Sequence, residues 1–293
     1  MMNFIDHNKV SAKIGKRLVK NKISSQLFFL STIFGLFILA VLLYRIGSQG
    51  YSFLSVDFFT NFASRIPERA GIKAALYGTL WLMAVVIPVS LILGVGTAIY
   101  LEEYAKKNFL TRFIQLNISN LAGVPSIVFG LLGLTVFVRL FGFDRSILAG
   151  GLTMSLVILP VIVVSSQEAI RSVPNQLREA SYALGSTKWK TIYRIVFPSA
   201  LPGILTGSIL AFSRAIGETA PLLVIGALSY VAFVPTDLFS GFTVMPIQIF
   251  NWTSRPQEAF QFVAAAGIIV LLVMLIIMNG VAVWIRNKFQ NRF

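Results

Sequence analysis

Long uncharged runs alternate with short charged segments along this chain, and the runs cover most of its length. An apolar α-helix crosses the hydrocarbon core of a bilayer in about 20 residues. Backbone polar groups find no water in that core, so such a run must satisfy them within a helix. The pattern therefore predicts an all-α membrane protein. The uncharged runs are residues 23–44, 74–101, 113–138, 146–167, 195–213, 219–236 and 259–285.

The number of spanning helices depends on residues 195–236, where Arg214 and Glu218 are the only charged residues. This stretch can form one helix followed by a loop, or two helices. Cytoplasmic segments carry an excess of Lys and Arg. Six helices with both termini inside place 17 Lys and Arg residues in cytoplasmic segments and seven outside, whereas seven helices turn the basic C-terminus outward. Six is the better fit. The expected spans are residues 25–45, 73–101, 115–139, 147–168, 201–224 and 261–285.

We expect one transmembrane domain, residues 25–288, between a basic cytoplasmic tail of residues 1–24 and a short cytoplasmic tail of residues 289–293. Six Lys and Arg residues between Lys9 and Lys22 precede the first apolar run, which is the pattern of a cytoplasmic N-terminus. A cleaved signal peptide is the competing interpretation. The run is too long for the core of such a peptide and no clear A-x-A site follows it, so we expect an uncleaved span.

Two segments are expected on the outer side. Residues 46–72 form an outer loop in which Phe58, Phe59 and Phe62 are predicted to lie along the membrane surface. Residues 225–260 are too apolar to extend freely into water, so we expect them to fold against the helix bundle.

Composition supports membrane embedding and excludes several kinds of chemistry. The chain is 56% hydrophobic and 12% charged, whereas soluble domains carry about 25% charged residues. Cysteine is absent and the single histidine is His7, so a thiol nucleophile, a sulfur metal site and an intramembrane histidine are excluded. The formal net charge of +14 does not indicate nucleic acid binding, because six of the basic residues sit immediately before the first apolar run, as expected of a cytoplasmic flank.

The loop at residues 168–202 is predicted to contain a short helix, a break and a second short segment. Pro174 can begin the first helix, where a missing N–H has no cost, and Gly185 can end it in the left-handed conformation. Ser186 or Thr187 can cap the next segment, which runs to Pro198. A connector between helices has about 2–8 residues, so this longer loop indicates a further role. Ala180 and Ala183 place small side chains on one face, where a partner can approach closely.

The same loop resembles the EAA loop of ABC importer permeases. The matching positions are Glu179, Ala180, Gly185 and the stretch Ile195–Pro198, with Ser181 in place of the second alanine and Phe197 in place of a leucine. In that family the loop docks in a cleft of a separate ATPase. The alternative is a loop that packs on its own bundle. The chain has no G-x-x-x-x-G-K-[ST] phosphate loop, so the resemblance implies that a partner binds ATP. The predicted coupling residues are Glu179, Ala180, Gly185 and Pro198.

An ion pair is predicted inside the fifth span, where Glu218 follows Arg214 by one helical turn. Charges at that depth are costly and face a bundle interior or a pathway. The pair is either a structural lock or an anion-binding arginine held by a carboxylate, and the spacing favours neither. Pro221 is predicted to kink or end the helix. On the third span, Pro125 and Ser126 are either a packing kink or a polar element of a pathway.

Three stretches resemble phosphate importer permeases, and Glu218–Pro221 within the first of them favours the PstA type over the PstC type. These are Arg214–Leu223, Gly123–Leu131, and residues 70–72 with 78–80. The resemblance covers about residues 54–285, with a family-like core at about 72–285. It implies an ABC importer permease (MetI-like) fold of six helices and a role for Arg214 and Glu218 in phosphate transport. The predicted pathway residues are Arg214, Glu218, Ser126 and Thr219, with helix kinks at Pro125 and Pro221.

The resemblance implies one permease subunit of an ATP-driven phosphate importer in a bacterial inner membrane. Its implied partners are a PstC-type sister permease, a PstB-type ATPase dimer, a PstS-type binding protein and a PhoU-type regulator, within a lipid bilayer and without nucleic acid. The chain is expected to be non-catalytic and to hold neither metal nor cofactor. One alternative is a permease for another oxyanion, sulfate or molybdate. A second alternative is an ion-coupled secondary transporter or channel. Such a protein would carry ion-coupling polar residues in several spans, whereas charge lies inside only the fifth span here.

Overall fold

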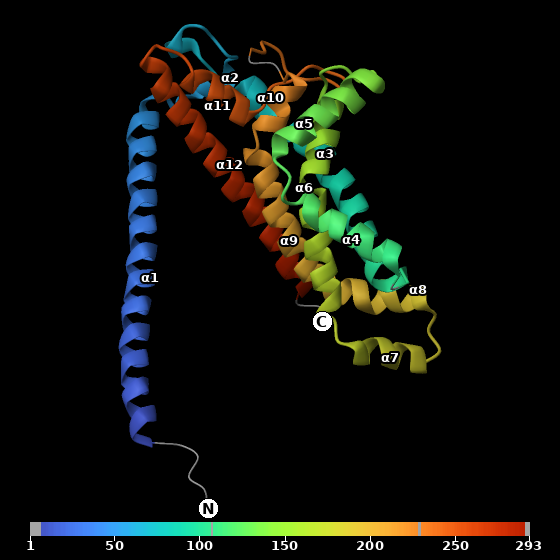
Figure 1. Ribbon diagram of the computed structural model, residues 1–293. Helices are drawn as coiled ribbons and strands as arrows, with labels where there is room; N and C mark the ends of the chain where they lie inside the picture. Colours follow the sequence, from blue (N-terminus) through green and yellow to red (C-terminus); the bar gives the residue numbers. More distant parts are fainter. Residues whose placement is uncertain (1–6, 107, 228–229, 291–293) are drawn as a thin grey trace, which may run out of the picture.

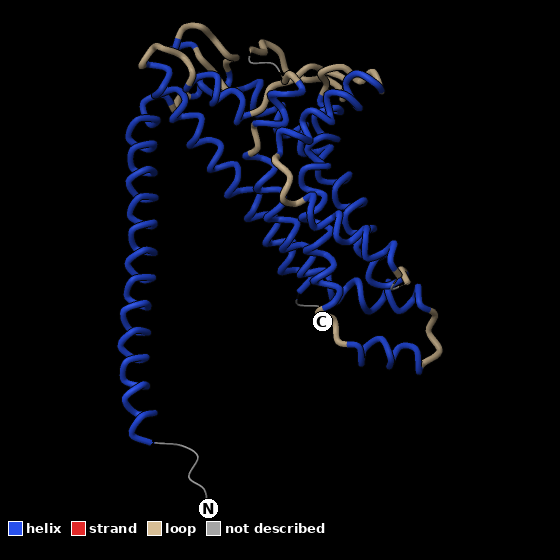
Figure 2. The backbone as a smooth tube through the Cα atoms, viewed as in Figure 1, coloured by secondary structure: helices blue, strands red, loops and turns tan. Residues whose placement is uncertain are grey.

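The computed structural model describes residues 7–106, 108–227 and 230–290. Helices are the regular structure of this described part, apart from one isolated antiparallel bridge between Ser146 and Gly241. Figure 2 shows the helices running largely side by side, with loops gathered mainly at one end. The all-α prediction is confirmed.

Within the described residues, five helical segments are long and apolar enough to cross a membrane, and a bent pair adds a sixth if it counts as one span. The long segments contain α1 (His7–Gly50), α3 (Lys73–Ile99), α6 (Ile147–Arg171), α9 (Phe197–Gly217) and α12 (Ala259–Gln290). The bent pair contains α4 (Phe109–Leu121) and α5 (Ser126–Gly133). Shorter helices are α2 (Val56–Thr60), α7 (Asn175–Ala183), α8 (Lys188–Thr191), α10 (Ala220–Ile225) and α11 (Met245–Thr253).

The third span is not the single helix predicted at residues 115–139. Its two halves, Phe109–Leu121 and Ser126–Leu140, meet at 105°. Pro125 stands before α5 with φ −55° and ψ 133°, so it lies at a break and not at a kink inside a helix. Proline disfavours the helical conformation in the residue before it and is well tolerated at the start of a helix, which explains the position of the break.

The fifth span also differs from the prediction of residues 201–224. Its helical segment is continuous from Lys188 to Gly217. Pro198 therefore lies inside it and does not end a separate segment. The π-helical turn Ile192–Val196 directly precedes the first turn of α9, next to the position where proline removes a backbone hydrogen bond. The chain leaves the helix at Glu218, whose backbone is extended at φ −75° and ψ 130°.

Helix α6 is the centre of the bundle and packs against α3 and α9. In its most apolar stretch 67% of the residues are buried, whereas none is buried in that of α1. Figure 1 shows α1 standing apart from the other helices for most of its length. It meets α12 near its C-terminal end, where a β-carbon on Gly50 would lie 2.7 Å from the backbone of Ala265. The helix begins before residue 25, so the basic residues preceding the predicted span continue the same helix.

Residues beyond α10 fold against the bundle, as predicted for 225–260. Helix α11 buries Trp252 completely, against Phe58 and Phe260. Its first N–H, that of Met245, donates to Thr79 Oγ1 at 3.0 Å. The prediction that Phe58 lies along the membrane surface is wrong, because only 2% of this residue is exposed. Its ring fills the space beside Trp252.

Candidate functional site

Arg214 and Glu218 form the predicted ion pair, although the helix ends between them. Arg214 Nε donates to Glu218 Oε1 at 3.0 Å. Gly217 is the last residue of α9, and the extended backbone of Glu218 still leaves its carboxylate within reach of the preceding turn. The Arg214 side chain is 47% exposed and that of Glu218 19%. Nearly half of the Arg214 side chain therefore remains exposed on the surface of this chain.

The two stretches singled out in the third and fifth spans meet in space through α5 and α10. A β-carbon on Gly130 would lie 2.8 Å from both the Cα and the carbonyl oxygen of Pro221, and 3.0 Å from Cβ of Val224. Only a residue without a β-carbon permits this approach. The breaks that follow Leu121 and Gly217 therefore allow two short helices to pack together in the upper part of the molecule (Figure 1).

Ser126 and Thr219 stand at the starts of these two short helices. Ser126 is the first residue of α5 and Thr219 directly precedes α10. Both are partly buried. Within the described residues, no hydrogen bond joins either side chain to Arg214 or Glu218. The structure brings together the segments that carry the four predicted pathway residues, and the direct polar contact is the Arg214–Glu218 pair.

Sequence reasoning missed a polar contact behind this pair. Ser213 Oγ lies 2.7 Å from Oδ1 of Asn279 and 2.8 Å from the carbonyl of Ile209. The contact joins α9 to α12 at the residue next to Arg214. A polar Asn deep in the uncharged run 259–285, whose other amide, Gln261, lies at its start, is the signal that points to it, because an amide within a membrane needs a hydrogen-bonding partner.

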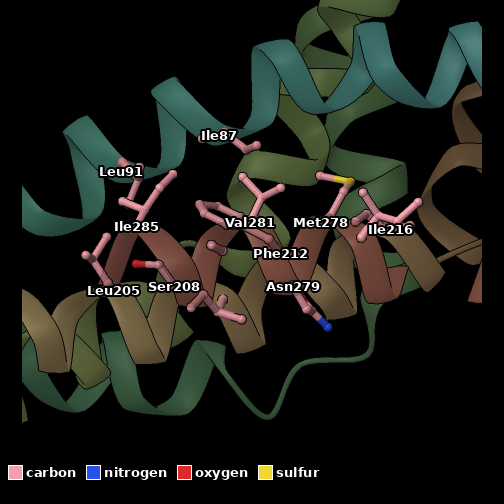
Figure 3. A pocket seen from close by; sticks show the side chains of 13 residues that line it. Ile87, Leu91, Leu205, Ser208, Phe212, Ile216, Met278, Asn279, Val281 and Ile285 are labelled. Atoms are coloured by element: carbon pink, nitrogen blue, oxygen red, sulfur yellow. The ribbon is translucent and has the colours of Figure 1, made fainter. Parts of the chain in front are cut away.

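A cavity of about 330 Å³ lies between α3, α9 and α12, beside Asn279. Figure 3 shows its mainly apolar lining, in which Ser208 and Asn279 are the polar side chains. Ser208 donates to the carbonyl of Ile204. Phe212 and Ile216 line this cavity, and at 100° per residue Arg214 points to the opposite side of α9. The cavity offers no basic group to an anion, so the charged pair belongs to a different surface.

Helix α7 has the start and end that the sequence predicts. Pro174 immediately precedes it, and Gly185 follows it with φ +76°. Thr187 then caps α8 by accepting from the N–H of Lys190 at 3.4 Å. Ala180 and Ala183 are exposed on this short helix, as is Glu179. The face proposed from the sequence for close approach of a partner is free in this chain.

Ser181, which replaces the second alanine of the EAA pattern, lies on the buried side of α7. It is 4% exposed, and its hydroxyl lies 2.8 Å from that of Thr191. This hydrogen bond holds α7 to α8. The departure from the pattern therefore has a structural explanation and leaves the exposed alanines unaffected.

Within the described residues, no group of three or more His, Cys, Asp and Glu side chains is arranged to hold a metal ion. Among the described residues, the side-chain ion pairs lie in two places. One is the Arg214–Glu218 pair, and the other is a set of ion pairs where the second span meets α6 and α7.

Residues 87–291 match the family described as binding-protein-dependent transport system inner membrane component. Among curated proteins, the phosphate transport system permease protein PstA 1 of Mycobacterium tuberculosis is 36% identical over 276 residues, which is 92% of this chain and 90% of the relative. PstA of Mycobacterium leprae is 38% identical over 89% of this chain and 86% of the relative. The probable ABC transporter permease YqgI of Bacillus subtilis is 33% identical over 94% of this chain and 98% of the relative.

Solved structures of ABC transporters share the fold. A chain of a bacterial alginate ABC transporter, in complex with an alginate-bound periplasmic protein, has a TM-score of 0.64 and 16% identity, covering 91% of this chain and 94% of that chain. A chain of the inward-facing MetNI methionine transporter has a TM-score of 0.62 and 16% identity, covering 73% of this chain and 94% of that chain. At this identity the likeness concerns the fold.

Proposed function

We propose that this chain, which belongs to the family of binding-protein-dependent transport system inner membrane components, is a permease subunit of an ATP-driven phosphate importer. The family and the apolar spans make it a multi-pass membrane protein of an ABC transporter. The cargo is inferred from the names of relatives that align over nearly the whole chain and from the charged pair at the end of α9.

The observation that carries the proposal is the half-exposed, charged side chain of Arg214. A charged group within a spanning segment is costly unless it faces protein or a polar pathway. Its carboxylate partner accepts a hydrogen bond from one of the three guanidinium nitrogens, Nε. In this single chain, 47% of the Arg214 side chain is exposed. A guanidinium offers paired N–H donors that match two oxygens of a phosphate. We place Arg214 on the surface that faces the second permease subunit, where an anion would pass.

Glu218 has two effects in this arrangement. Its carboxylate orients the guanidinium through the 3.0 Å hydrogen bond. It also repels an approaching anion, which limits how tightly phosphate is held and so allows it to leave. Ser126 and Thr219 add hydroxyl groups at the interrupted ends of the two short helices nearby. The chain itself forms and breaks no covalent bond in this mechanism.

The energy for transport comes from a partner in this proposal, because the chain has no phosphate-binding loop of the G-x-x-x-x-G-K-[ST] type. Helix α7 would dock its exposed Ala180 face in a cleft of the ATPase, which binds ATP. The remaining proposed partners are a PstC-type sister permease, a second PstB-type ATPase subunit, a PstS-type binding protein outside and a PhoU-type regulator. Both termini would then be cytoplasmic, with α7 on the same side.

The test is phosphate uptake by cells in which Arg214→Gln replaces the wild-type chain. We expect uptake to be abolished while the amount of this chain in the membrane and the co-purified ATPase remain unchanged. Arg286→Gln removes a positive charge from the last spanning helix and serves as the control. A variant that fails to accumulate in the membrane would support a purely structural ion pair. Sulfate competing as well as phosphate for wild-type uptake would overturn the assignment of the cargo.

A further inference from the structure

Three consecutive residues at the end of the second span contact three different helices of the α6–α8 region. They belong to the π-helical turn Tyr100–Tyr104, which continues α3. Glu102 binds Arg171 and Gln167 of α6, Glu103 binds Arg178 of α7, and the ring of Tyr104 lies 5.1 Å from Nζ of Lys188 in α8. Helical residues point about 100° apart, which lets adjacent side chains reach different neighbours.

The bond between α3 and α7 is the most enclosed of these contacts. Glu103 Oε1 accepts from Arg178 Nε at 3.2 Å and from Nη2 at 2.9 Å. The Glu103 side chain is 8% exposed and that of Arg178 is 15% exposed. A nearly buried ion pair costs far more to break than an exposed one. Separation of α7 from α3 would leave a carboxylate without its partner.

Arg178 also holds the end of α6, so one side chain connects three elements. Its Nη2 donates to the carbonyl of Ile170 at 3.0 Å, and its Nη1 to the carbonyl of Val173 at 2.6 Å. Nη1 also donates to Asn175 Oδ1 at 3.3 Å. These three bonds and the two to Glu103 use all five N–H donors of a guanidinium. Its orientation is therefore fixed from several directions.

Helix α7 has almost no apolar packing that would hold it instead. Ser181 is its only buried residue. Leu177 and Tyr182 are each 43% exposed, and Leu184 directly after the helix is 87% exposed. Arg178 and Ser181, three residues apart, lie on one side of the helix, and Ala180 lies about 200° around from Arg178. One side of α7 is thus bound to this chain by polar contacts, and the other side is free.

We propose that the Glu103–Arg178 pair is the link through which displacement of α7 reaches the second spanning helix, so that α7 and α3 move as one body during transport. Glu102 gives the link its second attachment, because its two oxygens accept from Arg171 Nε at 2.9 Å and from Nη2 at 2.7 Å. Helix α3 packs along α6. A displacement of α7 would therefore reach both helices through the turn Tyr100–Tyr104. Glu103 and Arg178 act as positioning residues and do not contact the cargo. This inference rests on the proposed docking of α7 in an ATPase.

The test uses the complete importer with its ATPase and binding protein, reconstituted in proteoliposomes, and the variant Glu103→Ala. Arg178 keeps its carbonyl partners in this variant, so α7 keeps its local structure. We expect unchanged co-purification of the ATPase and unchanged basal ATP hydrolysis, with at least a tenfold fall in phosphate imported per ATP hydrolysed. Glu168→Ala is the matched control, because it removes an exposed ion pair to Arg171 within α6.

An unchanged ratio of phosphate to ATP in Glu103→Ala would overturn the inference. A wild-type complex that retains no ATPase, or imports no phosphate, would instead overturn the proposed function. A second measurement tests the link without relying on transport activity, in case Glu103→Ala folds poorly. The natural chain has no cysteine, so Tyr100→Cys with Tyr182→Cys, both at exposed positions away from the Ala180 face, gives two spin-labelling sites without background. We expect one narrow distance distribution with and without ATP in the wild-type background and a broad one with Glu103→Ala. Equal widths in both backgrounds would also contradict the link.

Discussion

Gly130 of α5 lies so close to Pro221 of α10 that a β-carbon on the glycine would be 2.8 Å from the Cα of the proline. The two residues belong to interrupted spans that are far apart in the sequence. Their contact is between backbones, which leaves little room for adjustment. The position of α10, which follows the Arg214–Glu218 pair in the chain, is therefore set by a junction of two interrupted spans.

Gly130→Ala should separate these two helices. The added methyl group meets backbone atoms, so the chain must shift, which typically costs about 1–3 kcal/mol. We expect a lower melting temperature in detergent and a loss of most phosphate uptake. Gly96→Ala is the control, because a β-carbon there meets nothing within 4 Å. If the two variants had the same melting temperature and the same phosphate uptake, the Gly130–Pro221 junction would not matter for transport.

Glu218→Gln should make the pathway bind phosphate more tightly and turn over more slowly. The neutral amide still contacts Arg214 but no longer repels an anion. Two like charges about 4 Å apart repel by roughly 1 kcal/mol in water-like surroundings, so we expect KM for uptake to fall about fivefold, accompanied by a lower maximal rate. Initial rates at varied phosphate measure both values. A raised KM would show that the carboxylate acts only by holding the arginine in place.

Gly185→Pro should abolish docking of the ATPase. Gly185 has φ +76°, whereas a proline ring fixes φ near −65°, so the turn between α7 and α8 cannot form. We expect the variant to insert in the membrane, but the ATPase should no longer co-purify with it. Gly280→Ala in α12 is the control, since its β-carbon has open space. Full recovery of the ATPase with Gly185→Pro would place the docking surface elsewhere.

Thr79→Val should loosen the packing of α11 against α3. Thr79 Oγ1 accepts the N–H of Met245 at 3.0 Å and donates to the carbonyl of Ala75 at 2.8 Å. Valine has the same shape but leaves a buried N–H without an acceptor, which costs about 1–3 kcal/mol. We expect a lower melting temperature. Thr32→Val removes an exposed hydroxyl bonded within α1 and should leave the melting temperature unchanged.

The helices of the bundle were predictable from the sequence to different degrees. Helix α6 is close to its predicted range because charged and polar residues bound its apolar run at both ends. The third span was predicted as one helix because hydropathy carries no information about the direction of the chain. The apolar pattern continues unbroken through the 105° bend before α5. The end of α9 at Gly217 was missed for the same reason, since the apolar residues continue beyond Glu218.

The candidate sites divide in the same way. Arg214 with Glu218, and the turn at Gly185, were predictable because each depends on residues within one or two helical turns. Their chemistry is local. Ser213 with Asn279, separated by 66 residues, and Glu103 with Arg178, separated by 75, were not predictable. Nothing in a single sequence pairs such distant groups.

By itself, the sequence determined that this chain crosses a membrane several times, where α7 begins and ends, and that one span carries an ion pair. Each of these follows from local free energies of transfer into lipid or from the conformations open to Pro and Gly. Only the tertiary structure decided that two interrupted spans meet at Gly130 and Pro221, and that Glu103 holds α7 to the end of the second span. Those contacts depend on the angles at which helices pack, and the angles arise from the summed fit of many side chains.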